Sequence, residues 1–289
     1  MGGMIVTRDI AETRAAVSAA RQGGRRIAFV PTMGALHQGH VALMAAARRD
    51  GAFVVVSIFV NPTQFGPQED FAAYPRDEAG DLQVCEQAGV ELVFMPAVGA
   101  MYPEGAATSV RVAGLTETLC GASRPGHFDG VATVCAKLFN IVQPDAAYFG
   151  EKDAQQLAVI RRMVRDLDMP LEVVGCATVR EAGGLAVSSR NAYLSAAERE
   201  QAACLYGALC VARDRIAGGE RDAGAVTAAA REVIVAAGAA KIEYISVVGP
   251  ESLQEVRRID GPVLVALAMR IGPARLIDNM LVDPGEPGA

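Results

Sequence analysis

The sequence is short of several features that define special classes of protein. It contains no tryptophan, only three histidines in 289 residues, and 5% aromatic residues. Its six cysteines form no Cys-x-x-Cys pair, and most of them lie in apolar runs beside Val, Ala or Leu. This pattern predicts reduced, buried thiols.

Long hydrophobic runs and basic stretches are missing too. The N-terminal residues contain no apolar signal-peptide core, and the longest apolar run, residues 52–60, is too short to cross a bilayer. The formal net charge is −6, and no run of Lys or Arg exceeds two residues. The chain therefore lacks the electrostatic footprint of a nucleic-acid-binding protein. We expect no membrane and no nucleic acid as partners, and a cytoplasmic location.

What the sequence does contain is typical of a globular protein with two domains. Hydrophobic residues make up 51% and charged residues 21%, and the length exceeds the usual single-domain range of roughly 100–200 residues. Apolar runs typical of buried strands alternate with segments of helical spacing. The predicted strands cover residues 26–30, 53–60, 91–95, 146–149 and 171–179, and the predicted helices cover residues 10–21, 41–49, 77–88, 131–142 and 154–167.

Such alternation predicts an α/β fold with a doubly wound parallel, Rossmann-like sheet over residues 1–178. From residue 179 the pattern changes to Ala-rich helices near residues 196–216 and 223–237, followed by three short strands. These strands are expected at residues 242–248, 263–269 and 274–280, and the turn signal Arg-Ile-Gly-Pro between the last two indicates an antiparallel hairpin. We expect a smaller α+β domain over residues 179–289.

The most informative segment is PTMGALHQGH, residues 31–40, between the first predicted strand and the helix expected near Val41. Gly34 and Gly39 allow a tight turn and close backbone approach to a ligand, and the N–H groups of a helix start attract phosphate. His37 and His40 are three residues apart, so both imidazoles can contact one anion and stabilise charge developing on it. The segment therefore predicts a phosphate site.

Two other interpretations fit the same segment. A capped helix start with two surface histidines requires no chemistry, and a zinc site uses the same residue type. However, two of the three histidines lie here, and the third, His127, lies in a glycine-punctuated loop at residues 121–130. No cysteine or glutamate flanks the pair at metal-ligand spacing, which disfavours zinc.

A second loop, residues 61–70, follows the predicted strand that ends near Val60. The carboxamides of Asn61 and Gln64 can hold hydroxyl or carboxylate groups without adding charge. The polar, proline-bounded continuation to Arg76 is long enough to be a mobile lid. An ordinary structural loop is the alternative.

The third segment, FGEKDAQQL at residues 149–157, again joins a predicted strand to a helix. Gly150 permits close backbone approach, Lys152 offers a cation for phosphate, and Asp153 can cap the helix or accept from ribose hydroxyls. Capping alone explains Asp153. It does not explain Lys152, because a cation at a helix start opposes the helix dipole unless an anion is present.

The fourth segment, VREAGGLAVSSRN at residues 179–191, joins the two predicted domains. Ser188, Ser189 and Arg190 offer two hydroxyls and a guanidinium in succession, and a guanidinium binds phosphate oxygens bidentately. Together they predict a clamp for a polyphosphate. An N-cap followed by a linker is the alternative, which explains Ser188 better than it explains the set.

In this order, PTMGALHQGH, NPTQFGPQEDFAAYPR, RPGHFDGVATVCAKLFNIVQPDAAYFGEKDAQQL and VREAGGLAVSSRNAYLS resemble the pantothenate synthetase family. The His-x-Gly-His signature alone would indicate only the wider nucleotidyltransferase superfamily. The resemblance covers most of residues 31–195. It implies an AMP-forming acid–amino-acid ligase of pantothenate and coenzyme A biosynthesis, which condenses (R)-pantoate with β-alanine through a pantoyl-adenylate and releases AMP and pyrophosphate.

The resemblance also implies roles for individual residues. His40 would be the proton donor, Gln64 and Gln156 would bind pantoate, and Gln64 would also lie near β-alanine. The implied catalytic set is His37, His40, Lys152, Ser188, Ser189 and Arg190. The implied ATP-binding set is Pro31, Thr32, Met33, Gly34, Ala35, Leu36, His37, Gln38, Gly39, His40, Gly150, Glu151, Lys152, Asp153, Val179, Val187, Ser188, Ser189 and Arg190. The implied substrate-binding set is Asn61, Gln64, Arg124, His127 and Gln156.

Two positions depart from the family pattern: Asp is frequent where this chain has Gly183, and Met where it has Val187. Both positions lie on the implied hinge or adenine wall, so the departures bear on domain closure and nucleotide affinity. Mg²⁺ is expected with the ATP phosphates, with no protein ligand assigned. A homodimer is implied by the resemblance alone.

Two rival functions could use some of the same residues. One is a nucleotidyltransferase that adenylylates another small substrate, in particular a phosphorylated one, which would need a cationic pocket where this chain offers Gln64 and Gln156. The other is a non-catalytic nucleotide-binding regulator. The presence of the histidines, Lys152 and Arg190 argues against the regulator.

Overall fold

The computed structural model describes residues 3–49, 51–67, 69, 71–238 and 241–285. Two compact units are present. The first comprises Met1–Thr116, Arg124–Glu151 and Val159–Ala177, and the second comprises Glu117–Ser123, Lys152–Ala158 and Thr178–Ala289. The domain boundary expected after residue 178 stays a prediction, and the second unit takes in two short segments that precede it in the sequence.

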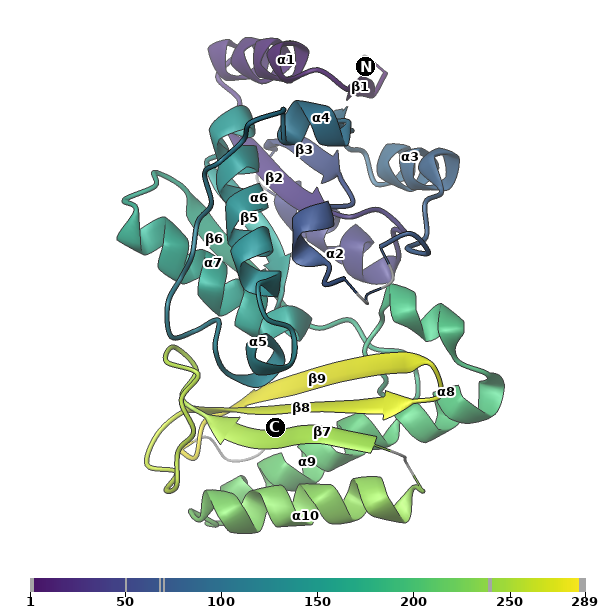
Figure 1. The fold of residues 1–289 in the computed structure, drawn as a ribbon, viewed down its shortest axis with the longest axis vertical. Helices are drawn as coiled ribbons and strands as arrows, with labels where there is room; N and C mark the ends of the chain where they lie inside the picture. The colour runs from purple at the N-terminus through teal and green to yellow at the C-terminus, as the bar shows by residue number, and fades with distance from the viewer. Residues whose placement is uncertain (1–2, 50, 68, 70, 239–240, 286–289) are drawn as a thin grey trace. The chain divides into compact units, whose positions relative to one another are not determined.

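The first unit is built on a six-stranded parallel sheet with the strand order β1-β4-β3-β2-β5-β6 (Figure 1). The predicted doubly wound α/β fold is confirmed. Its strands are β1 (Ile5–Thr7), β2 (Ile27–Thr32), β3 (Phe53–Ile58), β4 (Leu92–Phe94), β5 (Ala146–Gly150) and β6 (Glu172–Cys176). Its helices are α1 (Ile10–Gln22), α2 (Gln38–Ala47), α3 (Glu78–Gln87), α4 (Val98–Met101) and α6 (His127–Val142), with α7 (Ala154–Asp166) running between β5 and β6.

The central strands are apolar because both of their faces are covered. Alternate residues of a strand point to opposite faces. Val30 of β2 joins a buried cluster with Met44 of α2, whereas the neighbouring Phe29 makes an edge-to-face contact with Phe139 of α6, with ring centroids 6.3 Å apart. Near-continuous burial along β2 and β3 is the expected signature of a parallel sheet between two helical layers.

The strand order places a topological switch point between β2 and β5. From β2 the chain moves outward through β3 to β4, and from β5 it moves the other way to β6. β2 and β5 are direct neighbours, with Phe29 opposite Ala147. Ligands of open α/β sheets bind beyond the carboxyl ends of the strands at this point. The segments at residues 31–40 and 149–157 follow β2 and β5, so they begin at the expected edge.

Two helices begin earlier than the sequence predicts, and one predicted helix is divided in two. α2 begins at Gln38 and not near Val41, because His37 caps it. α6 begins at His127 and not at Val131, after Gly126 in the left-handed conformation (φ 81°). The predicted helix at residues 196–216 is divided into α8 (Ala196–Ala202) and α9 (Cys204–Ala217). Apolar periodicity locates the buried part of a helix but not its polar first turn.

The second unit is a small α+β structure, as predicted. Its antiparallel sheet has the order β7-β8-β9, formed by β7 (Lys241–Val248), β8 (Val263–Ile271) and β9 (Ala274–Val282). β8 and β9 form the expected hairpin, in which Arg270 pairs with Arg275. Helices α9 and α10 (Ala223–Ala236) lie along one face of this sheet, and α5 (Leu119–Ser123) also belongs to this unit (Figure 1).

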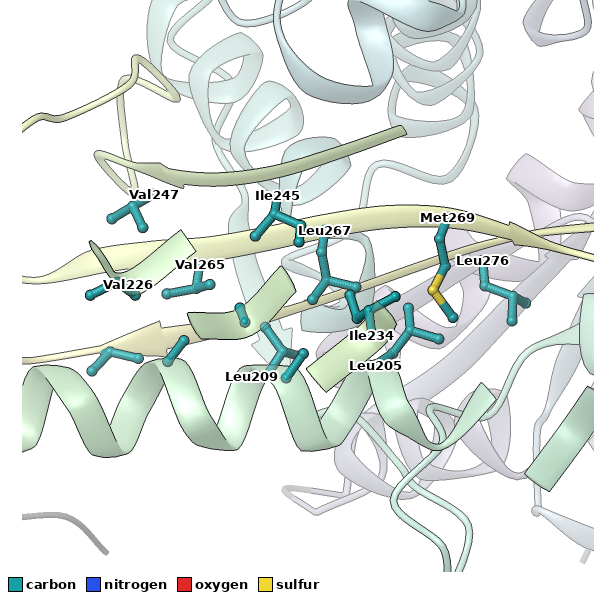
Figure 2. Packing of buried hydrophobic residues seen from close by; sticks show 14 of the residues in the cluster. Leu205, Leu209, Val226, Ile234, Ile245, Val247, Val265, Leu267, Met269 and Leu276 are labelled. Atoms are coloured by element: carbon teal, nitrogen blue, oxygen red, sulfur yellow. The ribbon is translucent and has the colours of Figure 1, made fainter. Parts of the chain in front are cut away.

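The core of the second unit lies between the sheet and these helices. Figure 2 shows Leu205 and Leu209 of α9 and Ile234 of α10 packed toward the strand residues Val265 and Leu267. All five are at most 1% exposed. Alternate strand residues therefore face the helices, and their neighbours in the sequence face the other side of the sheet.

All six cysteines are unbridged thiols. Cys85, Cys120 and Cys135 are buried as predicted, whereas the prediction of burial was wrong for Cys176, Cys204 and Cys210, which are half-buried. Burial raises the pKa of the Cys85 and Cys135 thiols to about 12. Among the described residues, no helix has both the length and the apolar character to cross a bilayer.

Adjacent residues of α10 provide a matched test of this core. Ile234 is 0% exposed and Val235 is 61% exposed. Ile234→Ala leaves a cavity and should lower the free energy of unfolding by about 2–5 kcal/mol. Val235→Ala should change it by less than about 0.5 kcal/mol. Urea unfolding followed by circular dichroism compares the two, and equal midpoints would show that α10 does not pack as described.

Candidate active site

The segment after β2 is held in place by side chains from within the first unit. Thr32 Oγ1 donates to the Ser57 carbonyl of β3 at 2.8 Å and accepts from Gly34 N–H at 3.2 Å. Gly34 has φ 80°, and a Cβ there would lie 2.7 Å from Asp81 Oδ2. Gly34 is therefore required by its backbone conformation and by the carboxylate packed against it.

Asp81, on α3, is the residue that fixes this turn. Its two carboxylate oxygens accept separate backbone hydrogen bonds, from Ala35 N–H at 3.0 Å and from Leu36 N–H at 2.7 Å. Ala35 has φ 51°, which is unfavourable for a residue with a Cβ. Asp81 is 4% exposed, and burial raises its pKa although the two N–H donors oppose the rise. The amides of Ala35 and Leu36 thus have an internal acceptor.

The two histidines cap helix α2 and one another. Gly39 N–H donates to Nδ1 of His37, and His37 N–H donates to Nδ1 of His40, each at 3.2 Å. The rings lie 4.1 Å apart between centroids. A ring nitrogen that accepts a hydrogen bond has no proton, so both neutral rings carry their proton on Nε2. The capped-helix interpretation is correct, but both residues are half-buried and do not lie freely on the surface.

The loop after β3 forms the short helix η1 (Pro62–Gln64). Asn61 is 1% exposed and donates from Nδ2 to Gln64 Oε1 and to the Gly130 carbonyl, both at 3.1 Å. Its Oδ1 accepts from the Tyr102 hydroxyl at 2.8 Å. The Asn61 carboxamide is therefore used within the protein, where it orients Gln64. Its direct contact with substrate stays a prediction.

Gln64 connects the first two segments. Its side-chain Nε2 lies 2.8 Å from Met33 Sδ, in the segment after β2. Its backbone is pressed against α6, because a Cβ on Gly130 would lie 2.7 Å from Gln64 N and would overlap the Thr63 carbonyl oxygen. Gly130 thus permits a close approach between helix and loop.

Arg124 and His127 contact the same loop from the other side. The Gln64 carbonyl accepts from His127 Nδ1 at 2.8 Å and from Arg124 at 3.3 Å. Since Nδ1 donates, the neutral His127 ring accepts at Nε2 from Arg124, at 3.1 Å. Arg124 also binds Glu69 bidentately, which lowers the pKa of Glu69 although burial opposes that shift. Both residues therefore orient Gln64, and their contact with substrate stays a prediction.

The proposed lid is described only in part. Phe65 packs edge-to-face against Phe71 and Tyr74, with ring centroids 5.4 and 5.7 Å apart. Gln68 and Asp70 lie outside the described residues. Whether the segment closes over a ligand stays a prediction.

In the third segment, Gly150 ends β5 and the short helix η2 (Glu151–Asp153) leads into α7. Lys152 and Asp153 belong to the second unit. Lys152 Nζ lies 3.6 Å from Asp153 Oδ1, so a carboxylate already offsets part of the lysine charge at this helix start. Gln155 is 7% exposed, and Gln156, the predicted pantoate ligand, is the next residue of α7.

The fourth segment folds back on itself as a small loop in the second unit. Val187 N–H donates to the Val179 carbonyl at 2.9 Å, so the two residues of the predicted adenine wall are paired. Gly184 has φ 88°, and a Cβ there would overlap the Tyr206 ring. At Gly183 a Cβ would meet only Ala203, at 3.9 Å, so the loop has room for the Asp frequent in the family.

Arg180 attaches this loop to the sheet. Its guanidinium lies over the Tyr206 ring, 4.3 Å from the centroid, and binds both carboxylate oxygens of Asp278 on β9 at 2.6 and 3.0 Å. Further along, Ser188 Oγ accepts from Arg190 N–H at 3.3 Å and caps the short helix η3 (Ser189–Tyr193). The N-cap interpretation holds for Ser188, and the phosphate clamp stays a prediction.

The structure thus gathers the predicted residues into two groups. In the first unit, Gln64 contacts Met33, which lies in the same segment as His37 and His40. In the second unit, the Lys152 carbonyl accepts a hydrogen bond from Asn279 on β9, and Arg180 of the loop at residues 179–191 binds Asp278 on the same strand. The sequence analysis did not single out Asp81, Asp278 or Asn279. An acidic residue in the first turn of a helix, or a polar residue on a strand, is common for purely structural reasons.

Comparison with known proteins gives one consistent result. The family described as pantoate-beta-alanine ligase matches residues 5–281. A pantothenate synthetase of Moorella thermoacetica is 54% identical over 280 residues, covering 97% of this chain and 99% of that protein. A pantothenate synthetase of Heliobacterium modesticaldum is 58% identical over 260 residues, covering 90% of this chain and 92% of that protein.

Solved structures agree. The crystal structure of pantothenate synthetase from Thermus thermophilus superimposes with a TM-score of 0.91 at 50% identity, over 96% of this chain and 99% of that one. The pantoate-beta-alanine ligase from Francisella tularensis, complexed with beta-gamma ATP and beta-alanine, gives a TM-score of 0.78 at 34% identity, over 98% of this chain and 100% of that one.

The role of Asp81 can be tested by replacing it with its amide. In Asp81→Asn only one side-chain oxygen remains, so one of the two backbone N–H groups loses its acceptor and meets an NH₂ group. We expect the free energy of unfolding to fall by about 1–3 kcal/mol. Asp9→Asn is the control, because a single oxygen of Asp9 accepts both N–H groups at the start of α1 and Asn caps helices equally well. Equal urea midpoints for the two variants would contradict the role given to Asp81.

Proposed function

This chain belongs to the pantoate-beta-alanine ligase family, and on that premise we propose that it activates pantoate as an acyl-adenylate with the residues gathered above. It is an ATP-dependent ligase that joins pantoate to β-alanine. The observation that carries the mechanism is the paired capping of His37 and His40, in which each Nδ1 accepts a backbone hydrogen bond and the proton of the neutral ring is therefore on Nε2.

Two displacements account for the reaction. A carboxylate is a poor acyl donor because its leaving group would be oxide. In the first step a pantoate carboxylate oxygen attacks the α-phosphorus of ATP, and the bond to the pyrophosphate oxygen breaks. In the second step the amine of β-alanine attacks the acyl carbon, loses a proton and displaces AMP. The enzyme contributes by orienting the reactants and by stabilising the charge on phosphate.

The histidines would act on the phosphates chiefly as hydrogen-bond donors. Each Nε2–H is held by a fixed ring, because Nδ1 is bound to the backbone. Donors that are fixed before the reaction stabilise developing negative charge without reorganisation. The fixed position of the His40 ring supports phosphate contact, and its role as proton donor stays a prediction.

Gln64 would bind the pantoate side of the substrates. The F. tularensis enzyme was solved in complex with beta-gamma ATP and beta-alanine. Asn61, Arg124 and His127 all contact Gln64. They would act mainly by fixing its orientation. We also assign pantoate binding to Gln156.

The remaining nucleotide contacts fall to the second unit. We propose that Lys152 and Arg190 bind phosphate oxygens, that Asp153 accepts from ribose hydroxyls, and that Val179 and Val187 pack against adenine. Ser188 and Ser189 would add hydroxyl contacts to phosphate. The hydrogen bond between the backbones of Val179 and Val187 supports the adenine assignment, because it holds two apolar side chains in a fixed relation.

Magnesium belongs to the proposal as a companion of ATP. Among the described residues no group of three or more His, Cys, Asp or Glu side chains is arranged to hold a metal ion. The residues present do not form a protein cage, so Mg²⁺ would be held mainly by phosphate oxygens and water. The homodimer and the cytoplasmic location also stay predictions.

Isotope exchange between labelled pyrophosphate and ATP tests the adenylate directly. Exchange should require pantoate and Mg²⁺ but not β-alanine, because the first step is reversible by itself. Pantothenate and AMP should appear only when β-alanine is added. Exchange that requires β-alanine would contradict a separate adenylate, and exchange with another acid but not with pantoate would favour the adenylyltransferase alternative.

The donor role of the histidines is separable from their capping role. His37→Asn keeps an N-cap oxygen but removes Nε2–H, so adenylation should slow by roughly 10²-fold with stability almost unchanged. His37→Ala should show the same rate and in addition lose about 1 kcal/mol of stability. The measurements are single-turnover adenylation and urea unfolding. Near-normal adenylation by well-folded His37→Asn would exclude the phosphate role.

A further inference from the structure

Strand β9 presents different side chains to its two sides. Leu276 and Val282 are at most 5% exposed and belong to the core beneath α9 and α10. Asp278 has the same parity, is 3% exposed and meets Arg180 on that side. Alternation along the strand places Arg275 and Asn279 on the opposite face of the sheet.

A side chain on that opposite face donates a hydrogen bond to the backbone of the segment at residues 152–158, which contains Lys152. Asn279 Nδ2 donates to the carbonyl oxygen of Lys152 at 2.7 Å. Both residues belong to the second unit. The bond fixes the main chain at Lys152 and does not involve its ammonium group, so Asn279 and the phosphate would not compete for the lysine.

A second contact stabilises the same segment. Arg275, on the same face of β9 as Asn279, donates to Ser123 Oγ at 3.2 Å and lies 3.5 Å from Cys120 Sγ. Gln155 accepts from Cys120 N–H at 3.0 Å and donates to the Thr118 carbonyl at 2.8 Å. Residues 117–123 and 152–158 are therefore bonded to one another and to one face of the sheet.

Asp278, the neighbour of Asn279 on β9, supports the loop at residues 179–187, which also carries proposed nucleotide contacts. Asp278 binds Arg180, which anchors the loop at residues 179–187, and its Oδ1 also accepts from Asn279 N–H at 2.8 Å. Two consecutive residues thus hold two separate segments, one on each side of the sheet. A shift of β9 would displace both.

We propose that Asn279 is a positioning residue for the adenylation step, which acts through Lys152. Its amide holds the Lys152 main chain at the start of α7 and so sets where the ammonium group meets phosphate. Misplacing a charged donor by about 1 Å can cost roughly 10²-fold in rate. The inference rests on the phosphate role proposed for Lys152.

A double-mutant cycle tests this coupling. Asn279→Ala should lower kcat for adenylation by roughly 10-fold or more and leave KM for pantoate within about twofold. In a Lys152→Ala background, Asn279→Ala should change the rate by less than about twofold, because the group that it positions is gone. Asn279→Asp keeps the side-chain volume and removes the Nδ2–H donor. This second variant should therefore show the same loss of kcat as Asn279→Ala.

Asn140→Ala is the matched control. Asn140 also donates from Nδ2 to a backbone carbonyl, that of Ala136 at 2.8 Å, and it is exposed on α6. It should leave adenylation unchanged. Because Asn140 is exposed and bonds only within its own helix, its replacement should change the free energy of unfolding by less than about 0.5 kcal/mol, whereas Asn279→Ala should lower it by about 1 kcal/mol.

The outcomes separate the inference from its premise. Near-normal adenylation by Lys152→Ala would refute the phosphate role of the lysine. A slow Lys152→Ala variant beside a normal Asn279→Ala variant would refute the positioning role alone. Fully additive losses in the double variant would also refute it, because they would show that Asn279 acts independently of Lys152.

Discussion

The first unit depends on one buried carboxylate that is shared between two backbone N–H groups. Asp81 holds the turn at Ala35 and Leu36 in a conformation that an alanine seldom adopts. The turn delivers the chain to His37 at the position and angle needed for an N-cap. Because the caps fix both imidazole tautomers, the donors at Nε2 of His37 and His40 are a consequence of a carboxylate on another helix.

The second unit repeats this arrangement with different residues. Asp278, almost fully buried, binds Arg180 bidentately and holds the loop at residues 179–187. Its neighbour Asn279 holds the Lys152 main chain. A buried acid paired with an arginine or with backbone N–H groups is costly to remove, because its partners would be left without an acceptor. In both units the groups proposed to meet ATP are therefore fixed by buried polar contacts.

The fold and the candidate site differ in how far the sequence predicts them. Alternating apolar strands and amphipathic helices were sufficient for the parallel sheet, the small α+β unit and the hairpin of β8 and β9. The short edge strand β1 was missed, because three residues carry no periodicity. The role of Gln64 in substrate binding stays a prediction. Its contacts with Met33 and His127 join positions 31 and 63 residues away, and no local pattern encodes such contacts.

The sequence by itself determined the fold class, the family and the positions of the four segments, because periodicity, glycine placement and ordered motifs are properties of neighbouring residues. Only the tertiary structure decided what those residues do for one another. Gly34 and Gly39 make room for the side chains of Asp81 and His37. Backbone N–H groups that donate to Nδ1 determine which nitrogen of each neutral histidine ring carries the proton. The hydrogen bonds from Ala35 and Leu36 to Asp81 join positions 46 and 45 residues apart. The capping bonds of the two histidines are local, but they too form only when the chain has folded into the turn before α2.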